Sequence, residues 1–187
     1  MKGKMIHKRK IIIAAAALLF LLTVGYACYV VEIGNFRAIT PGEAYRSAQL
    51  ESDKLEYYIK QYGIRSILNL RGENSEMQWY KDEMRASAAY GVAHYDIAMS
   101  SSRFPTDETI KELISILKTA PRPILIHCQY GADRSGLVAA MWKVIVDNEP
   151  KSEAKKQLSF LYGHVPILGR DAMDRFFEKW PVEQYSH

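Results

Sequence analysis

The sequence predicts an α/β fold in which a small, mainly parallel central sheet is flanked by helices and preceded by one N-terminal transmembrane helix. Three observations lead to this prediction. Segments typical of strands alternate with segments typical of helices, which is the pattern of βαβ units. Residues 11–31 form an uncharged run. The rest of the chain, about 150 residues, is enough for one domain with one core.

The uncharged run has the length of a membrane span. As a helix, residues 11–31 extend for about 30 Å, the thickness of the hydrocarbon core of a bilayer. Residues 1–10 form a basic tail, and such a tail stays on the cytoplasmic side. We therefore expect residues 11–31 to be a signal-anchor in the inner or cell membrane. The single-pass chain then carries residues 32–187 as a domain on the extracytoplasmic, periplasmic side.

Two other kinds of export signal also fit the same run of residues. Gly25 and Ala27 are small residues at the −3 and −1 positions of a signal-peptide cleavage site. A lipoprotein signal ending at Cys28 fits less well, because Gly25 and Tyr26 are poor neighbours for that processing. The apolar residues continue through Val31, which favours the uncleaved anchor. All three readings place the domain outside the cytoplasm.

Composition and charge exclude several classes of protein. The net charge is +4, but five basic residues precede the first acidic residue, Glu32, so that residues 32–187 carry 20 basic and 21 acidic side chains. Nucleic-acid binding, which needs clustered Lys and Arg on the folded domain, is not expected. A hydrophobic content of 48% excludes a disordered chain. Cys128 is the one cysteine after Cys28, so the domain forms no internal disulfide.

The elements follow one another in a regular order. Ser52 is the expected N-cap of a helix over residues 52–62, and Gly63 suits its left-handed C-terminal position. Residues 64–70, which include the apolar side chains of Ile64, Ile67, Leu68 and Leu70, predict a strand. Asp107 and Glu108 occupy the first turn of a later helix, where the helix dipole favours acids. The other expected elements are helices over residues 75–90, 134–147, 152–162 and 171–180 and strands over residues 92–97 and 124–127.

Functional residues are expected where the parallel strands end, since the crevice of such a sheet lies at its carboxyl edge. Three segments meet there: residues 71–73, residues 98–106 and the segment after His127. Residues 127–136 read HCQYGADRSG, a cysteine after a buried strand, a five-residue loop and an arginine that opens a helix. Backbone N–H groups in such a loop bind a tetrahedral anion. The expected phosphate-binding residues are Gln129, Tyr130, Gly131, Ala132, Asp133 and Arg134.

The side chains of this segment fit nucleophilic chemistry. The loop dipoles lower the pKa of the Cys128 thiol, which makes it a nucleophile at neutral pH. Arg134 presents a planar fork for two phosphoryl oxygens. Gly131 lets the backbone approach the ligand without a Cβ atom. Ser135 is placed to hydrogen-bond the sulfur, and His127 is expected to orient the loop.

This segment resembles the signature of the cysteine-dependent protein tyrosine and dual-specificity phosphatases. Residues 43–49 and 67–73 are similar to upstream landmarks of the compact atypical members, and the layout resembles exported bacterial ones over residues 36–180. The resemblance implies hydrolysis of phosphomonoesters through a phosphocysteine intermediate, without a metal or other cofactor. The expected catalytic residues are Cys128, Arg134 and Ser135, with Asp133 as the first candidate for the general acid.

The general acid is the least defined of these residues. The family's acid usually lies in a loop about 25–35 residues before the cysteine, but residues 100–104 contain no carboxylate. Asp133, inside the phosphate loop, is the first candidate, because some lipid-phosphatase relatives use an Asp within this loop. Asp107 is the alternative acid, although its place in a first helical turn is equally a capping feature. Asp96 is expected on a strand, in a structural role.

The variable loop positions give the substrate expectation. They carry no Lys or Arg, which favours a phosphoprotein with phosphotyrosine or phosphoserine/threonine over a highly phosphorylated molecule. A membrane phospholipid or small phosphomonoester is the alternative substrate. The alternative function that involves no catalysis is that of a phosphate-reading adaptor. Arg71 and Arg103 either add charge from neighbouring loops or are solvated surface residues. His94 and His164 show no metal-ligand spacing and are expected to be surface or packed residues.

Overall fold

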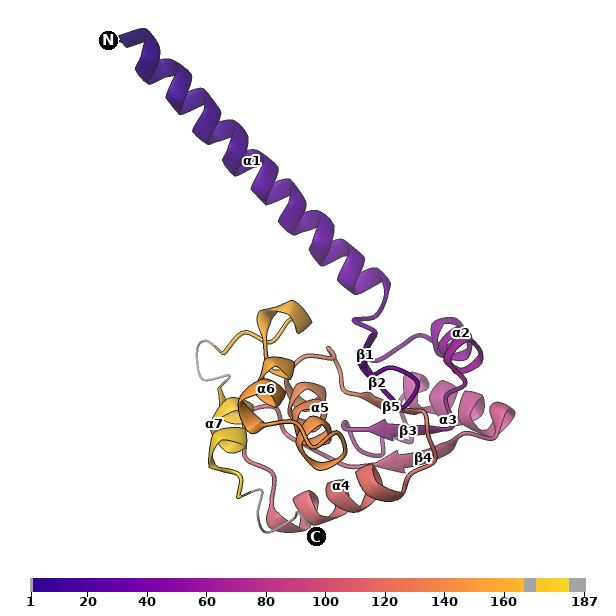
Figure 1. The fold of residues 1–187 in the computed structure, drawn as a ribbon. Helices are drawn as coiled ribbons and strands as arrows, with labels where there is room; N and C mark the ends of the chain where they lie inside the picture. The colour runs from indigo at the N-terminus through magenta and orange to yellow at the C-terminus, as the bar shows by residue number, and fades with distance from the viewer. Residues whose placement is uncertain (1, 167–170, 182–187) are drawn as a thin grey trace. The chain divides into compact units, whose positions relative to one another are not determined.

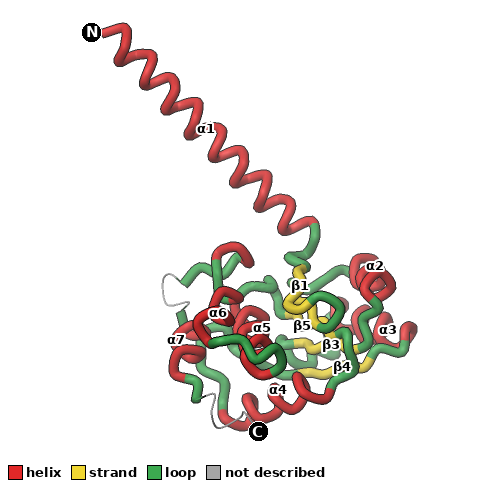
Figure 2. The backbone as a smooth tube through the Cα atoms, viewed as in Figure 1, coloured by secondary structure: helices red, strands yellow, loops and turns green. Residues whose placement is uncertain are grey.

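The strand β5 (Ile124–His127) forms the centre of a five-stranded sheet in the computed structural model, which describes residues 2–166 and 171–181. Figures 1 and 2 show the strands lying between helices. The sheet order is β1-β2-β5-β3-β4, in which β2, β5, β3 and β4 run parallel and β1 pairs antiparallel at the edge. The mainly parallel sheet is therefore confirmed. The other strands are β1 (Arg37–Thr40), β2 (Ala44–Ser47), β3 (Ser66–Asn69) and β4 (Ala93–Asp96).

Alternating side chains of β5 pack into two separate cores, as the period of two in a strand requires. Ile124 and Ile126 join the core that includes side chains of α4 (Asp107–Thr119), α5 (Asp133–Ile145) and α7 (Ala172–Lys179). Leu125 joins the core with α2 (Ser52–Tyr62) and α3 (Gln78–Tyr90). The domain is thus a three-layer sandwich with helices on both faces of the sheet (Figure 1).

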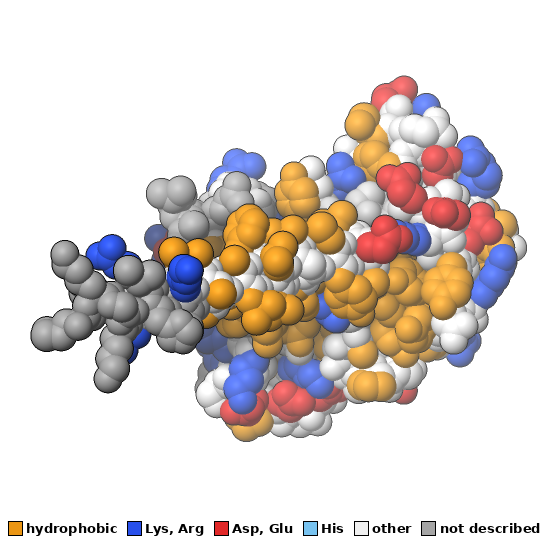
Figure 3. All heavy atoms as spheres, turned by 90° about the horizontal axis from the view of Figure 1, so that it is seen from above, with side chains coloured by type: hydrophobic (Ala, Val, Ile, Leu, Met, Phe, Trp, Pro, Cys, Tyr) orange, Lys and Arg blue, Asp and Glu red, His pale blue; other side chains and the backbone are white. Residues whose placement is uncertain are grey.

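The chain divides into two units, residues 1–33 and 34–187. The first consists mainly of α1 (Lys2–Glu32). Its part from Lys8 to Glu32 is long and apolar enough to cross a membrane, by length and composition, as a signal sequence also is. Hydrophobic side chains run along this part of α1 (Figure 3). In the second unit, residues 167–170 and 182–187 of the expected domain lie outside the described residues.

The helix ends agree with the expected signals in most places. Gly63 and Gly91 end α2 and α3 in the left-handed conformation, with φ of 60° and 64°. At α2 the N-cap position is Glu51 instead of Ser52, and no side chain caps the helix there. At α4 the Thr106 hydroxyl accepts the first free N–H, from Thr109.

Two strands had no prediction, and one expected helix was wrong. The strands β1 and β2 have four residues each, and β2 buries the polar side chains of Arg46 and Ser47. The expected helix over residues 152–162 is broken into α6 (Lys151–Ala154) and two 3-10 turns, Lys155–Gln157 and Phe160–Tyr162. It breaks because the carbonyl of Gln157 accepts a hydrogen bond of 2.7 Å from Arg46, and Leu158 leaves helical geometry with ψ of 73°.

Candidate active site

The loop between β5 and α5 encloses the sulfur of Cys128, which is 2% exposed. The Oγ of Ser135 lies 3.5 Å from the sulfur. Burial by itself raises the pKa of the thiol, but the hydroxyl and N–H of Ser135, the charge of Arg134 and the N–H of Tyr130 outweigh it. The pKa of Cys128 is therefore lowered from its ordinary value, which favours the nucleophilic thiolate.

Arg134 is held at the carboxyl ends of the strands, beside the sulfur. Its Nη1 donates hydrogen bonds of 3.2 Å to the carbonyls of Leu70 and Met99. Its Nε is buried and has no hydrogen-bond partner among the described residues. This leaves a donor for an anion in the adjacent pocket. The pocket is lined by Ser101, Cys128, Gln129, Tyr130, Asp133 and Arg134.

Two side chains hold the loop from behind, through its carbonyls. Arg46 of β2 is fully buried, and its Nη2 donates bonds of 2.9 Å to the carbonyls of Gly131 and Ala132. Asn35 donates to the carbonyls of Tyr130 and Gly131, at 3.1 and 3.2 Å. Burial lowers the pKa of Arg46 to about 10, so the side chain stays charged at neutral pH. With these carbonyls engaged away from the sulfur, the loop's N–H groups are free to face an anion.

Gly131 has a structural role in addition to the expected one. Its φ is 69°, a left-handed value that favours glycine. A Cβ atom there would lie 2.6 Å from the nitrogen of Ala48 and 2.7 Å from the carbonyl carbon of Ser47. The missing side chain lets the loop pack against the end of β2, so the close approach is to the protein's own backbone.

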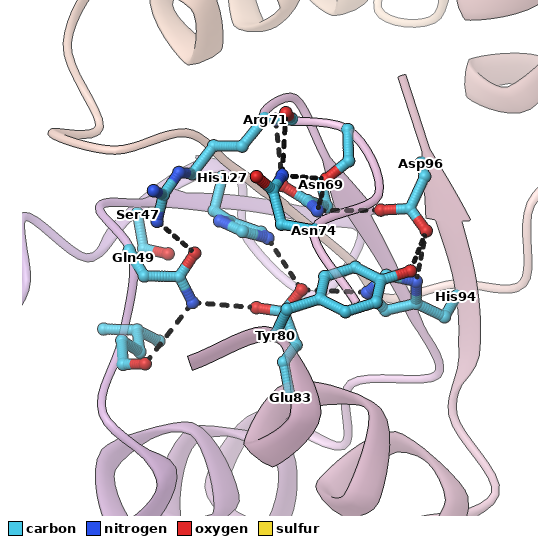
Figure 4. Close-up of polar contacts among 12 residues, drawn as sticks. Ser47, Gln49, Asn69, Arg71, Asn74, Tyr80, Glu83, His94, Asp96 and His127 are labelled. Atoms are coloured by element: carbon cyan, nitrogen blue, oxygen red, sulfur yellow. Dashed lines mark hydrogen bonds and ion pairs between the residues drawn. The ribbon is translucent and has the colours of Figure 1, made fainter. Parts of the chain in front are cut away.

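Behind the loop, the carboxylate of Glu83 joins two histidines (Figure 4). Glu83 is 3% exposed, and its Oε1 lies 3.1 Å from Nε2 of His127 and 2.8 Å from Nε2 of His94. Its Oε2 accepts a bond of 3.0 Å from Gln49. Burial raises the pKa of Glu83, but the charge and hydrogen bond of His127, with the other two donors, lower it well below the usual range. His127 is thereby fixed beside Cys128.

Arg71 joins the network of Glu83 through Gln49 (Figure 4). Its Nη1 donates to Oε1 of Gln49 at 3.3 Å, and its guanidinium lies 3.8 Å from the centre of the Trp79 ring. Partial burial lowers the pKa of Arg71, as does the charge of Arg134, while the charge of Cys128 raises it. Arg71 therefore contributes positive potential beside the reactive sulfur.

The three candidate acids occupy different places. Asp133, at the start of α5, lines the pocket. Asp107 is the first residue of α4, is exposed, and is not among the pocket's lining residues. Asp96 ends β4 and accepts hydrogen bonds from Asn69, at 2.7 Å, and from the Tyr80 hydroxyl, at 2.6 Å. Of the three, Asp133 alone is beside Cys128 in the pocket.

A histidine that the sequence left unassigned contacts Asp133. Nδ1 of His164 lies 2.6 Å from Oδ1 of Asp133, and its Nε2 lies 2.6 Å from Oδ2 of Asp174. His164 is fully buried, so it is a packed residue. Within residues 2–166 and 171–181, no group of three or more His, Cys, Asp or Glu side chains is arranged to hold a metal ion.

Sequence reasoning missed several residues around the site: Asn35, Arg46, Glu83 and Asp174 were not singled out, and His164 had no role. Glu83 offered a signal, because it shares the buried face of α3 with Tyr80, Ala86 and Ser87 at helical spacing. The other missed residues contact partners in distant parts of the chain. For Arg46 and Gly131 the separation is 85 residues, and no local pattern reports such a pair.

Comparisons with known proteins agree with this geometry. A family model described as "DSP-PTPase phosphatase fused to NAD+ Kinase" matches residues 40–167, more than half of the chain. The inositol diphosphatase SIW14 of Saccharomyces cerevisiae is 28% identical over 107 residues, which are 54% of this chain. This chain spans 36% of the length of that relative.

Solved structures share the fold. TpbA of P. aeruginosa superposes with a TM-score of 0.61 at 18% identity, over 81% of this chain and 88% of that one. A cysteine-to-serine variant of TpbA, solved in complex with phosphotyrosine, gives 0.62 at 17% identity, over 82% and 88%. The catalytic domain of the SIW14 phosphatase from S. cerevisiae, in complex with citrate, gives 0.62 at 23% identity, over 81% and 88%.

Proposed function

The chain belongs to the DSP-PTPase phosphatase family, and from that premise we propose that it hydrolyses phosphomonoesters through a phosphocysteine intermediate on Cys128. One observation carries the proposal. The buried sulfur has a lowered pKa and shares its pocket with Arg134, whose buried Nε has no hydrogen-bond partner among the described residues. A candidate nucleophile and a candidate anion-binding cation thus line the same small pocket.

The proposed reaction has two steps. In the first, the Cys128 thiolate forms an S–P bond as the P–O bond to the leaving group breaks, and the Asp133 carboxyl protonates the leaving oxygen. Arg134 and the loop's N–H groups bind the remaining phosphoryl oxygens. In the second, water attacks phosphorus, the S–P bond breaks and Asp133 takes the proton. The Ser135 hydroxyl stabilises the departing thiolate.

The proposed substrate is a phosphoprotein that carries phosphotyrosine or phosphoserine/threonine. Gln129, Tyr130 and Ala132 add no positive charge to the pocket's loop, which disfavours a highly phosphorylated ligand. A cysteine-to-serine variant of TpbA, which shares the fold, has been solved in complex with phosphotyrosine.

A second candidate substrate is a membrane phospholipid or a small phosphomonoester. Arg71 favours it, because this cation interacts electrostatically with Cys128 and Arg134. The relative SIW14 is named an inositol diphosphatase, which also points to a small substrate.

The proposed enzyme is anchored in the inner or cell membrane by α1, with its domain on the periplasmic side. The apolar stretch within Lys8–Glu32 supports an anchor. The basic residues Lys8, Arg9 and Lys10 at its start support this orientation.

The test uses the purified full chain in detergent with 4-nitrophenyl phosphate. We expect hydrolysis that vanadate inhibits and EDTA does not, and that falls by roughly 10³-fold or more in Cys128→Ser. Cys28→Ser, at the other cysteine, is the matched control and should keep wild-type rates. Activity that survives Cys128→Ser contradicts the mechanism. Phosphate binding without turnover in the wild type indicates an adaptor. Phosphopeptides and phospholipid vesicles, assayed side by side, then separate the two substrate classes.

A further inference from the structure

His164 lies between two carboxylates behind the reactive pocket. Its ring nitrogens are each 2.6 Å from an aspartate oxygen, Nδ1 from Asp133 and Nε2 from Asp174. Asp133 begins α5, and Asp174 lies in the first turn of α7. Gly163, with φ of 77°, ends the 3-10 turn just before His164. Three separate segments of the chain therefore meet at one buried imidazole.

The charges around this imidazole favour its protonated form. Burial lowers the pKa of His164, but the hydrogen bonds and charges of Asp133 and Asp174 outweigh it, and the pKa is raised overall. Arg46 of β2 also acts on Asp133 electrostatically, and the Tyr162 ring lies under that guanidinium at 4.5 Å. An imidazole with an acceptor at both nitrogens satisfies both only as the cation, because the neutral ring carries a single N–H.

One oxygen of Asp133 is left for the substrate. His164 contacts Oδ1, and Oδ2 has no hydrogen-bond partner among the described residues. Asp133 lines the same pocket as Cys128 and Arg134. A carboxyl group that acts first as an acid and then as a base must keep one oxygen in place over the leaving group.

We propose that His164 is a positioning residue for the general acid: Asp174 orients the imidazole, and the imidazole holds Oδ1 of Asp133 so that Oδ2 faces the leaving group. This inference rests on the proposed phosphatase function. When the P–O bond breaks, the proton passes from Oδ2 to the leaving oxygen, and the carboxylate that remains is paired with the imidazolium. In the hydrolysis step Oδ2 takes a proton from water. His164 keeps its own protons throughout.

The test compares two aryl phosphates on the full chain, because an acid matters mainly for a poor leaving group. In His164→Leu, kcat for phenyl phosphate should fall about 10²-fold, while kcat for 4-nitrophenyl phosphate and both KM values stay within about threefold. His164→Asn, which offers an N–H near the position of Nδ1, should recover part of the loss.

Asp174→Asn should show the same leaving-group dependence with a smaller loss. The matched control is Asp171→Asn, three residues away, whose half-exposed carboxylate pairs with Arg175 at 3.8 Å. It should leave both rates unchanged.

Equal losses on both substrates, or no loss on either, overturn the positioning role. So does a His164→Asn protein that melts like the wild type but recovers none of the rate on phenyl phosphate. An inactive wild type, or a Cys128→Ser variant that keeps its rate on 4-nitrophenyl phosphate, overturns the proposed function instead, and the role of His164 with it.

Discussion

At the scale of single residues, the buried cation Arg46 shapes the phosphate loop. Burying a lone charge costs several kcal/mol, yet this guanidinium is fully buried. It donates to the carbonyls of Gly131, Ala132 and Gln157. The same side chain thereby ties the loop to the broken helical segment near Gln157. Loop conformation is set by a residue that is not expected to touch the substrate.

The choice of acid is also decided at this scale. Asp133→Asn should lower kcat for phenyl phosphate by about 10²-fold and change kcat for 4-nitrophenyl phosphate little, because it removes the transferable proton but keeps an oxygen for His164. Asp107→Asn should leave both rates unchanged, since that carboxylate is exposed and outside the pocket. The measurement is steady-state hydrolysis of the two esters by each variant. The opposite pattern identifies Asp107 as the acid.

At the scale of elements, local signals predict some segments and not others. The strand at Ile124–His127 was predicted with these bounds, because an apolar run after prolines leaves little choice. The ends of α2 and α3 followed from Gly63 and Gly91. In contrast, β2 carries Arg46 in its interior, and only the distant loop carbonyls make that burial favourable. Its polar sequence therefore conceals a buried strand.

The helix α3 supports the site through Glu83, and this contribution depends on pH. The pKa of Glu83 is lowered in the folded state. Its stabilisation is thus complete above the ordinary carboxyl pKa of about 4.3 and is lost as pH falls towards the folded-state value. Glu83→Gln should lower the free energy of unfolding at pH 7 by about 1.5–3 kcal/mol. Urea denaturation at pH 7 and at lower pH checks this, and the difference from wild type should narrow below about pH 4.

The matched control for Glu83→Gln is Glu112→Gln, because Glu112 is an exposed residue of α4. It should change the unfolding free energy by less than about 0.5 kcal/mol at either pH. If Glu83→Gln lowers the free energy of unfolding equally at pH 7 and at low pH, the result contradicts a role for the charge of Glu83.

At the scale of the whole molecule, the two units have separate tasks. Residues 34–187 contain both buried cores and every residue that lines the pocket. The sequence predicted this unit's fold class because strand and helix periods alternate clearly. The supports of the loop were not predictable in the same way, since they depend on tertiary pairs such as His127 with Glu83, which lie 44 residues apart.

A chain shortened to residues 34–187 should fold and act as the full chain does. We expect kcat for 4-nitrophenyl phosphate within about threefold of the full chain, in buffer without detergent, because the apolar span within Lys8–Glu32 is removed. In a bacterial host the full chain should sediment with membranes and resist extraction at high pH. Fractionation followed by immunoblotting measures this. A full chain found in the soluble fraction contradicts the anchor.

The contacts around the loop also bear on when the enzyme becomes active after synthesis. Supports of the loop and of Asp133 come from Asn35, near the start of the domain, and from Asp174, near its end. A nascent chain therefore lacks the full set of these supports until α7 has been synthesised and has docked. While the polypeptide is still extended it lacks these supports, and the proposed turnover begins only with the completed tertiary structure. Catalytic activity is consequently a direct readout of native folding in this protein.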